Sequence, residues 1–354
     1  MAFRAPSSFV PEQLLSNIDP ALDQFWHPVA PITELPADGA PLKVELLGKS
    51  WVLVTLAQRL VALWDRCPHR LVPLSEGAVV GDRLQCRYHG YEFDADGACR
   101  HIPALGDVTP PAHIGLPRAH VRTAFGLVWL CAAEHPAPFP LDESPYLDPD
   151  LDAFIAGPFD TPVGAGILTD NFLDVTHLAF LHTQTFGEST PPTHELNIDR
   201  HEWTVHQTTE SITSQYGAPV AVRYEYELQA PFACELKMTA MAGPMAGKSD
   251  YVWSFCQPQA ADRTRWYMVQ AYAGLGHDQR NIAAAKDFQI KIGLEDLSIL
   301  EPMPHPHLPL DNSETHTRGD KGCVAYRQIM KAIVSGHTRV THETGSKQSV
   351  SRAS

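Results

Sequence analysis

The segment CPHRLVPLSEGAVVGDRLQCRYHG, residues 67–90, contains two short pairs of metal-binding side chains. Cys67 and His69 form the first pair, and Cys86 and His89 form the second, with 16 residues between His69 and Cys86. Thiolates and imidazoles bind zinc and iron. Each pair follows an expected β-strand, so two neighbouring loops can direct all four side chains at one centre. The segment therefore predicts a metal-binding β domain.

Two kinds of metal centre use this ligand set. In one, a two-iron two-sulfur cluster, two Cys hold one iron and two His hold the other. In the other, a structural zinc ion takes Cys₂His₂ in tetrahedral geometry, usually with like ligands paired as C-x-x-C followed by H-x-x-x-H. Each loop here contributes one Cys and one His. This favours the two-iron cluster and leaves zinc as the alternative. The seven cysteines have no disulfide-like spacing, so metal ligation is their expected chemistry.

Short strands are expected around the segment, and a second, larger domain after it. Strands are predicted at 42–48, 50–56, 59–64 and within 122–133. A proline-rich acidic stretch then marks a boundary. Apolar and polar residues alternate over 222–229 and 234–240, and a further strand begins at Arg265, which predicts an antiparallel sheet. Helices are predicted over 169–182, 282–300 and 324–334. The expected organisation is an N-terminal segment 1–24, a β domain 25–135, a linker 136–150, a catalytic domain 151–336 and a polar, disordered tail 337–354.

A second constellation lies in NFLDVTHLAFLH, residues 171–182. On the predicted helix Asn171, Asp174 and His177 fall on one face at i,i+3 steps. His182 lies five residues after His177, about 140° further round a regular helix. The helix must therefore end or distort if both histidines bind one metal. Two satisfied core histidines are the alternative interpretation of the segment taken alone.

Together the two constellations resemble the Rieske non-haem iron oxygenases, specifically the alpha or terminal oxygenase subunit of the ring-hydroxylating type. CPHR and CRYHG are similar to the cluster-binding loops, and residues 171–182 are similar to the family's N-x-x-D-x-x-H-x-x-x-x-H segment. The resemblance runs from about residue 25 to 334. It implies an α+β fold in which a Rieske β domain precedes an antiparallel sheet with helices, in a helix-grip-like arrangement.

The resemblance also implies roles for individual residues. Cys67, His69, Cys86 and His89 would hold the 2Fe-2S cluster, and His177 and His182 would bind a mononuclear Fe(II). Asn171 and Asp174 are assigned to the catalytic site. In the family the Asp links the mononuclear iron to the Rieske cluster of a neighbouring subunit, which implies a homotrimer and a contact with His89 of the adjacent copy.

A third iron ligand, a carboxylate, is expected on the predicted helix 282–300 or just beyond its end. The available carboxylates are Asp287, Glu295, Asp296 and Glu301. Asp296 shares an apolar helical face with Ile292, Ile299 and Leu300. Asp287 and Glu295 each lie four residues from Lys291 and are expected to be solvated. The stretch EDLSILEPMP also resembles the family's D-x-x-x-x-E segment, whose Asp is the third ligand. Both arguments select Asp296.

The net charge of −14 disfavours nucleic acid or an anionic membrane as partner. The N-terminal residues show no apolar signal region and no apolar stretch is long enough to span a bilayer, so a cytoplasmic protein is expected. No G-x-G-x-x-G motif is present, so electrons would come from a separate reductase or ferredoxin.

The expected activity is monooxygenation of a small organic substrate with O₂, by hydroxylation or by oxidative N- or O-demethylation. Arene cis-dihydroxylation is the alternative, and a Rieske electron carrier without oxygenase activity is a remote one. Between residues 201 and 272, where the substrate is expected, the apolar and aromatic side chains fit an ordinary core equally well, and none is assigned to the substrate.

Overall fold

The computed structural model describes residues 11–186, 196–213, 219–311 and 313–336. The predicted disordered tail 337–354 and the first ten residues lie outside this part of the chain. Sheets dominate the structure, with a few helices. Among the described helices none combines the length and apolar character needed to cross a membrane.

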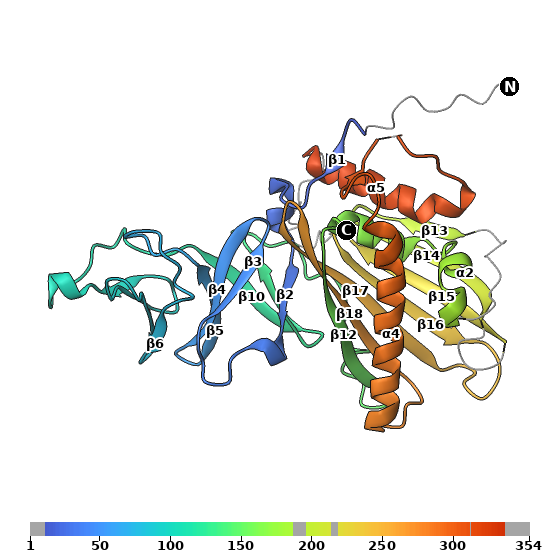
Figure 1. Cartoon of the computed structure of the whole chain (residues 1–354), viewed down its shortest axis with the longest axis horizontal. Helices are drawn as coiled ribbons and strands as arrows, with labels where there is room; N and C mark the ends of the chain where they lie inside the picture. The colour runs from blue at the N-terminus through green and yellow to red at the C-terminus, as the bar shows by residue number, and fades with distance from the viewer. Residues whose placement is uncertain (1–10, 187–195, 214–218, 312, 337–354) are drawn as a thin grey trace, which may run out of the picture.

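The N-terminal half is built from two small antiparallel sheets. The first has strand order β2-β11-β10-β5-β4-β3, with β2 His27–Pro31, β3 Leu42–Leu46, β4 Lys49–Leu56, β5 Arg59–Trp64, β10 Arg118–Ala124 and β11 Leu127–Cys131. The second has order β6-β7-β8-β9, with β6 Ala78–Val80, β7 Arg83–Gln85, β8 Glu92–Phe93 and β9 Cys99–His101. This confirms the strands predicted at 42–64 and 122–133. The four-stranded sheet lies at the end of the molecule away from the C-terminal half (Figure 1).

The strand connections explain why this half folds locally. The turn between β3 and β4 is Leu47-Gly48, and the turn between β4 and β5 is Ala57-Gln58. All four residues have positive φ, between 47° and 74°. Two-residue turns with positive φ at both positions match the right-handed twist of the strands they join. They hold three consecutive strands in register, and Cys67 follows the last of these.

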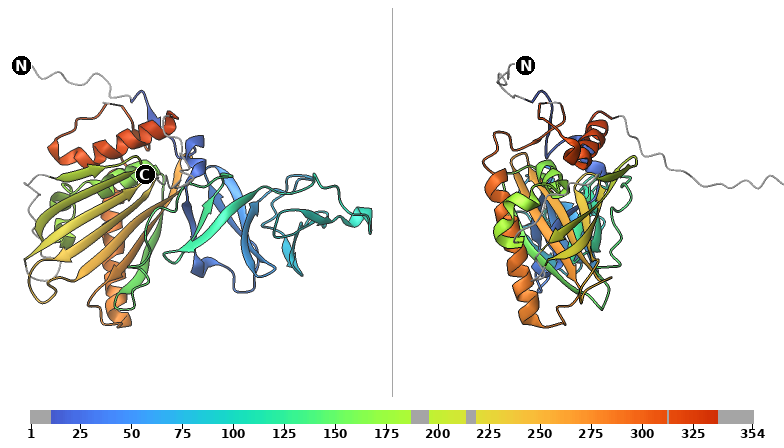
Figure 2. Two further views of the ribbon diagram at one scale, coloured as in Figure 1. Left: turned by 180° about the vertical axis from the view of Figure 1, so that it is seen from behind. Right: turned by 90° about the vertical axis from the view of Figure 1, so that its right-hand side faces the viewer.

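The C-terminal half is a seven-stranded antiparallel sheet with helices. Its order is β12-β18-β17-β16-β15-β14-β13, with β12 Asp152–Thr161, β13 Asn197–Arg200, β14 Thr204–Thr213, β15 Val220–Gln229, β16 Ala233–Ala240, β17 Ser249–Ala260 and β18 Arg263–Tyr272. Helix α4, Gln279–Leu300, lies along one face of this sheet, and α5, Lys321–Val334, lies across its end (Figures 1 and 2). The predicted alternating strands and both C-terminal helices are confirmed.

Short elements complete the fold. A two-stranded sheet joins β1, Leu14–Leu15, to β19, Leu308–Pro309. Single turns of 3₁₀ helix occur at Pro20–Gln24, Ile32–Glu34, Pro103–Leu105 and Arg318–Asp320. The predicted linker forms neither helix nor strand. Buried side chains of both halves, such as Val44 of β3 and Val252 of β17, belong to one hydrophobic cluster. The two halves therefore share a core, and the exact domain limits stay a prediction.

The prediction of one helix over residues 169–182 is wrong. The segment forms α1, Ala165–Leu173, then α2, Leu178–Leu181, and α3, Thr183–Phe186. Asp174 ends α1 with an extended backbone, and its Oδ1 accepts hydrogen bonds from the Thr176 amide (2.8 Å) and hydroxyl (2.6 Å). Gln207 donates to the Leu173 carbonyl at the helix end (3.1 Å). Local side-chain bonds of this kind compete with helix continuation. These three bonds therefore stabilise the break that precedes His177.

Candidate metal centres

The first candidate centre lies in the two loops that follow β5 and β7. The Cys67 amide donates to Val72 O (2.9 Å) and Leu71 N donates back to Cys67 O (2.7 Å). In the second loop the Cys86 amide donates to Tyr91 O (2.8 Å). Gly90 N donates to Cys86 O (3.0 Å), and Gly90 has φ +69°, which favours glycine at this turn. Each loop is thus closed on itself by a matching pair of backbone bonds that fixes its Cys.

The four predicted ligands divide by type between the inside and the outside of this region. Cys67 and Cys86 are both buried, whereas His69 and His89 are exposed. The two imidazole rings have centroids 4.4 Å apart, and His69 stacks on Tyr91 at 4.9 Å. The structure therefore brings the two histidines together on the outer side and places the cysteines on the inner side.

A single zinc ion fits this arrangement poorly. Bonds of about 2.0–2.3 Å to four ligands require all four ligand atoms to lie within about 4 Å of one another. Throughout the described residues, only one group of three or more His, Cys, Asp or Glu side chains has ligand atoms within 4.8 Å of one another, and it contains none of these four. A two-iron cluster separates its Cys-bound and His-bound metals. The two loops therefore fit a 2Fe-2S cluster better than a single zinc ion.

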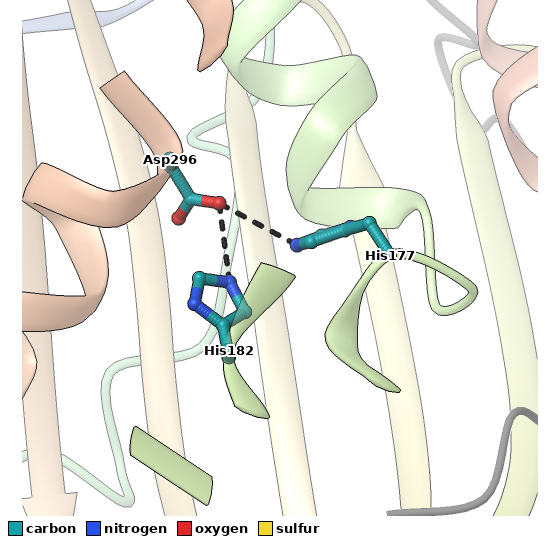
Figure 3. A group of neighbouring side chains, drawn as sticks. All are labelled: His177, His182 and Asp296. Carbon is teal, nitrogen blue, oxygen red and sulfur yellow. Dashed lines mark ion pairs between the residues drawn. The ribbon is translucent and has the colours of Figure 1, made fainter. Parts of the chain in front are cut away.

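The second candidate centre is the group of His177, His182 and Asp296, whose side chains point toward one another from the two ends of α2 and from α4 (Figure 3). His177 Nε2 lies 3.5 Å from Asp296 Oδ1, and His182 Nε2 lies 3.2 Å from the same oxygen. His177 immediately precedes the four-residue helix α2, and His182 immediately follows it. Because the helix ends before His182, the rotation expected for five residues of regular helix does not turn the His182 side chain away from His177.

The polar atoms of this group fit a metal ion. His182 Nε2 and Asp296 Oδ1 are buried and have no hydrogen-bond partner within the described residues. Two imidazoles and one carboxylate on one side of a cavity form the facial set that binds non-haem Fe(II). Burial lowers the pKa of His177, but the Asp174 and Asp296 carboxylates outweigh it and raise that pKa to about 9. The two imidazoles in turn hold the pKa of Asp296 at about 2, against the effect of burial. An incoming metal must therefore displace a proton from His177.

Sequence reasoning misplaced two neighbours of Asp296. Glu295 was expected to be solvated, but its side chain is only 19% exposed and it accepts a hydrogen bond from His182 Nδ1 (2.8 Å). Thr185 donates to the other oxygen of Glu295, and Lys291 lies 3.8 Å from it. Ile299 was expected on the inward face but is 57% exposed. The inward face of α4 is therefore displaced from the predicted one, because it includes the buried Gly293 and Leu297 and leaves out Ile299. Asp287 is exposed as expected.

The helix α4 approaches the sheet closely because of Gly293. A Cβ at this position would lie 2.7 Å from the Phe159 ring of β12. Ile292 and Asp296, on the same inward side, are both buried. The glycine therefore sets the depth at which Asp296 meets the two histidines.

Asn171 and Asp174 lie beside the triad but differ in their contacts. Asn171, on α1, lines the cavity described below. Asp174 Oδ2 is 3.6 Å from His177 Nδ1, which is longer than a hydrogen bond, and its Oδ1 is engaged by Thr176. The interaction between His177 and Asp174 is thus electrostatic.

A cavity of about 430 Å³ opens beside the triad. Most of its wall is apolar, with Leu236 and Met238 from β16, Val252 from β17, Met268 from β18, and Phe288 and Ile292 from α4. Asp250, Tyr272 and Gln289 add polar groups that sequence reasoning missed. In the sequence, the one indication of these polar residues is Asp250, a charged residue at an inward position of a strand. Of the aromatic strand residues, Tyr226 lines the cavity, whereas Trp253 and Trp266 are buried in the core.

Comparisons with known proteins agree with both centres. Residues 25–112 match the Rieske 2Fe-2S domain family, and residues 163–336 match the vanillate O-demethylase oxygenase C-terminal domain family. Methylxanthine N1-demethylase NdmA from Pseudomonas putida is 29% identical over 89% of this chain and 90% of its own length. Methylxanthine N3-demethylase NdmB from the same organism is 35% identical over 46% of this chain and 49% of its own.

Solved structures agree as well. NdmA of Pseudomonas putida CBB5 with caffeine superposes with a TM-score of 0.77 at 26% identity, covering 91% of this chain and 93% of its own. Dicamba monooxygenase bound to dicamba has a TM-score of 0.76 at 19% identity over 91% of this chain and 99% of its own, which shows a common fold. These relatives favour monooxygenation over arene dihydroxylation. The chain belongs to the Rieske non-haem iron oxygenases, enzymes that use a 2Fe-2S cluster and a mononuclear iron to oxidise small organic molecules with O₂.

Proposed function

We propose that this oxygenase removes a methyl group oxidatively from a small organic substrate, an N-methyl group in particular. The observation that carries the proposal is the meeting of His177, His182 and Asp296 at the wall of a 430 Å³ apolar cavity. A cavity of this size suits a substrate of one or two rings. The N-demethylase NdmA, which aligns with most of the chain, supports the choice of methyl oxidation.

Two further assignments belong to the proposal. His177, His182 and Asp296 would hold the mononuclear iron, and Cys67, His69, Cys86 and His89 would hold the cluster. When bound, the iron supplies oxygen activation and the cluster supplies electrons. The overall reaction consumes one O₂, two electrons and two protons. It converts the N–CH₃ group into an unstable N–CH₂OH group and releases water, after which N–C cleavage gives formaldehyde and the N–H product.

The chain's own residues have distinct tasks in this scheme. Glu295 and Thr185 orient the His182 ring, so that its Nε2 points at Asp296. Phe288, Ile292, Met268 and the other apolar wall residues exclude water from the cavity. Asn171 also lines the cavity and offers an amide for hydrogen bonding.

Electrons are proposed to come to the cluster from a separate reductase or ferredoxin. Within one chain the cluster loops and the triad lie in opposite halves of the molecule (Figure 1). That separation supports transfer between neighbouring copies in a homotrimer, with Asp174 of one copy facing His89 of the next. A cytoplasmic location, also predicted from the sequence, stays part of the proposal.

Single turnover of the reduced holoenzyme tests the proposed reaction. The enzyme is reduced anaerobically, mixed with O₂ and a panel of N-methyl and O-methyl compounds, and the products are identified by mass together with formaldehyde. Stoichiometric formaldehyde with loss of the methyl group supports the proposal. Products that gain oxygen and keep every methyl group would identify a hydroxylase instead.

A further inference from the structure

The active-site cavity runs along one face of helix α4. The helix contributes Ala285, Phe288, Gln289, Ile292 and Asp296 to the cavity wall. These positions recur with the helical period, so they form one stripe along the helix. Ala285 and Asp296 are eleven residues apart, a rise of about 16 Å. The cavity therefore has one end at the triad and another near the start of α4.

Two loops at one edge of the sheet meet at this second end. The first is the turn between β16 and β17, residues 241–248, and the second joins β18 to α4. Met245 of the first loop and Gly274 and Leu275 of the second line the cavity. The Asn281 side chain donates to the Leu275 carbonyl (2.9 Å), which attaches the second loop to the first turn of α4. The side chains that the two loops bring to the cavity are thus apolar.

The end of the Met245 side chain lies against the backbone of Gly274. A Cβ at Gly274 would be 2.9 Å from Met245 Cε and 3.3 Å from its Sδ, so a side chain at position 274 would displace the thioether. Gly274 has φ +85°, a conformation that glycine adopts readily. Met245 is half-buried although it lines the cavity. Its side chain therefore connects the two loops, with one side toward the cavity and the other toward solvent.

We propose that Met245 sets the length of the substrate, so that the cavity accepts N-methyl compounds with a compact, apolar opposite end and rejects longer ones. The inference rests on the proposed function, which puts the methyl group at the triad. The opposite end of the substrate then meets Met245, Leu275 and Ala285. Packing against Gly274 holds the otherwise flexible methionine across this end. One methylene too many in an apolar pocket changes the preference by about 10- to 200-fold.

Equilibrium binding to the oxidised holoenzyme, measured calorimetrically without turnover, tests the inference. The probes are the 4-methyl, 4-propyl and 4-pentyl derivatives of N,N-dimethylaniline and the parent compound, which share one ring and one N-methyl end and differ in length. Wild-type affinity should rise by about fourfold for each methylene that the cavity buries, and should fall once the chain reaches Met245. Affinity that never falls across the series would overturn the proposal without any variant.

Met245→Ala sharpens the test because it removes Cγ, Sδ and Cε and should move the limit to longer chains. The 4-pentyl compound should gain about tenfold or more in affinity relative to the 4-methyl compound. Iron content and cluster absorbance should match those of the wild type, which shows that the variant is folded. An unchanged length limit in this variant would overturn the role of Met245.

Met241→Ala is the matched control. Met241 lies in the same turn between β16 and β17, but it is 43% exposed and does not line the cavity. It should leave the length dependence unchanged. The same shift in Met241→Ala as in Met245→Ala would mean that the turn as a whole, and not the Met245 thioether, sets the limit.

The two proposals fail in different ways. A length limit that moves in Met245→Ala, without formaldehyde in single turnover, would remove the demethylase proposal and leave the role of Met245 standing. Formaldehyde release by an enzyme whose length limit is the same in the wild type and in Met245→Ala would do the reverse.

Discussion

The two candidate iron centres are held in opposite ways. In the cluster loops the histidines are exposed, and all four predicted ligands come from 23 consecutive residues, 67–89. In the mononuclear centre His182 and Asp296 are buried, and the ligands come from elements more than 100 residues apart in the chain. The first centre is fixed by two self-closed loops, and the second by the packing of α2 and α4 on the sheet.

The difference follows from what each centre exchanges. Under the proposed function, electrons would reach the cluster from another protein chain, which suits histidines that lie at the surface of the single chain. Oxygen chemistry must be kept from water, so the second centre is buried beside an apolar cavity. Each cluster loop is closed by its own backbone bonds, whereas the triad requires α4 to pack beside α2.

Cys67→Ser gives the largest expected effect, because the cluster loses a thiolate that serine does not replace. The purified wild-type protein should be brown and contain about three irons per chain, two in the cluster and one in the triad. The variant should lose the cluster absorbance and all product formation, measured by visible spectroscopy, iron analysis and turnover. Cys86→Ser should behave alike. Stoichiometric zinc and no visible absorbance, after anaerobic reconstitution with iron and sulfide, would show that the loops form the alternative centre.

Asp296→Ala should affect the other centre alone. Loss of the carboxylate leaves two imidazoles, too few ligands to retain Fe(II), so mononuclear iron and turnover should both be lost while the Rieske spectrum persists. Electron paramagnetic resonance with iron analysis separates the two populations. Asp287→Ala, an exposed carboxylate on the same helix, is the control and should change neither. Loss of mononuclear iron in Asp287→Ala, with iron retained in Asp296→Ala, would mean that the third ligand is misassigned.

Asp174→Asn tests whether the two centres communicate between copies of the chain. The variant keeps its size and its bonds to Thr176, so iron content and cluster reduction should stay near wild type. Removal of the negative charge should sharply slow electron transfer to the mononuclear iron and therefore product formation. In single turnover of the pre-reduced variant, product at the wild-type rate would refute the Asp174 bridge. Full activity in a monomeric protein would refute the trimer as well.

Glu295→Gln gives the smallest expected effect. Glutamine still accepts a bond from His182 through its carbonyl but lacks the charge that strengthens it. Iron affinity should fall by about 10- to 100-fold, as for other groups that orient metal ligands. Metal titration of the apo-mononuclear form measures this, and the cluster spectrum should not change. Affinity equal to wild type would mean that packing alone orients the His182 ring.

The sequence predicts the candidate ligands of both centres better than it predicts the backbone that carries the two histidines of the mononuclear centre. The cluster ligands could be chosen from sequence because Cys67 and Cys86 each lie in a short loop that follows a predicted strand. Asp296 could also be chosen, since its neighbours Ile292 and Leu300 recur with the helical period and are buried. The course of residues 169–182 could not, because Asp174, Thr176 and the distant Gln207 end α1 before His177.

Sequence by itself selected the candidate ligands of both centres, the strands near the cluster loops and the class of enzyme, because these depend mainly on residue types in short local patterns. Only the tertiary structure decided the partner of His182, the depth of α4 and the placement of Asp250, Tyr272 and Gln289 in one cavity. Those features join residues from different strands and helices. Their proximity follows from how the sheet and α4 pack, and no local pattern of residues encodes it.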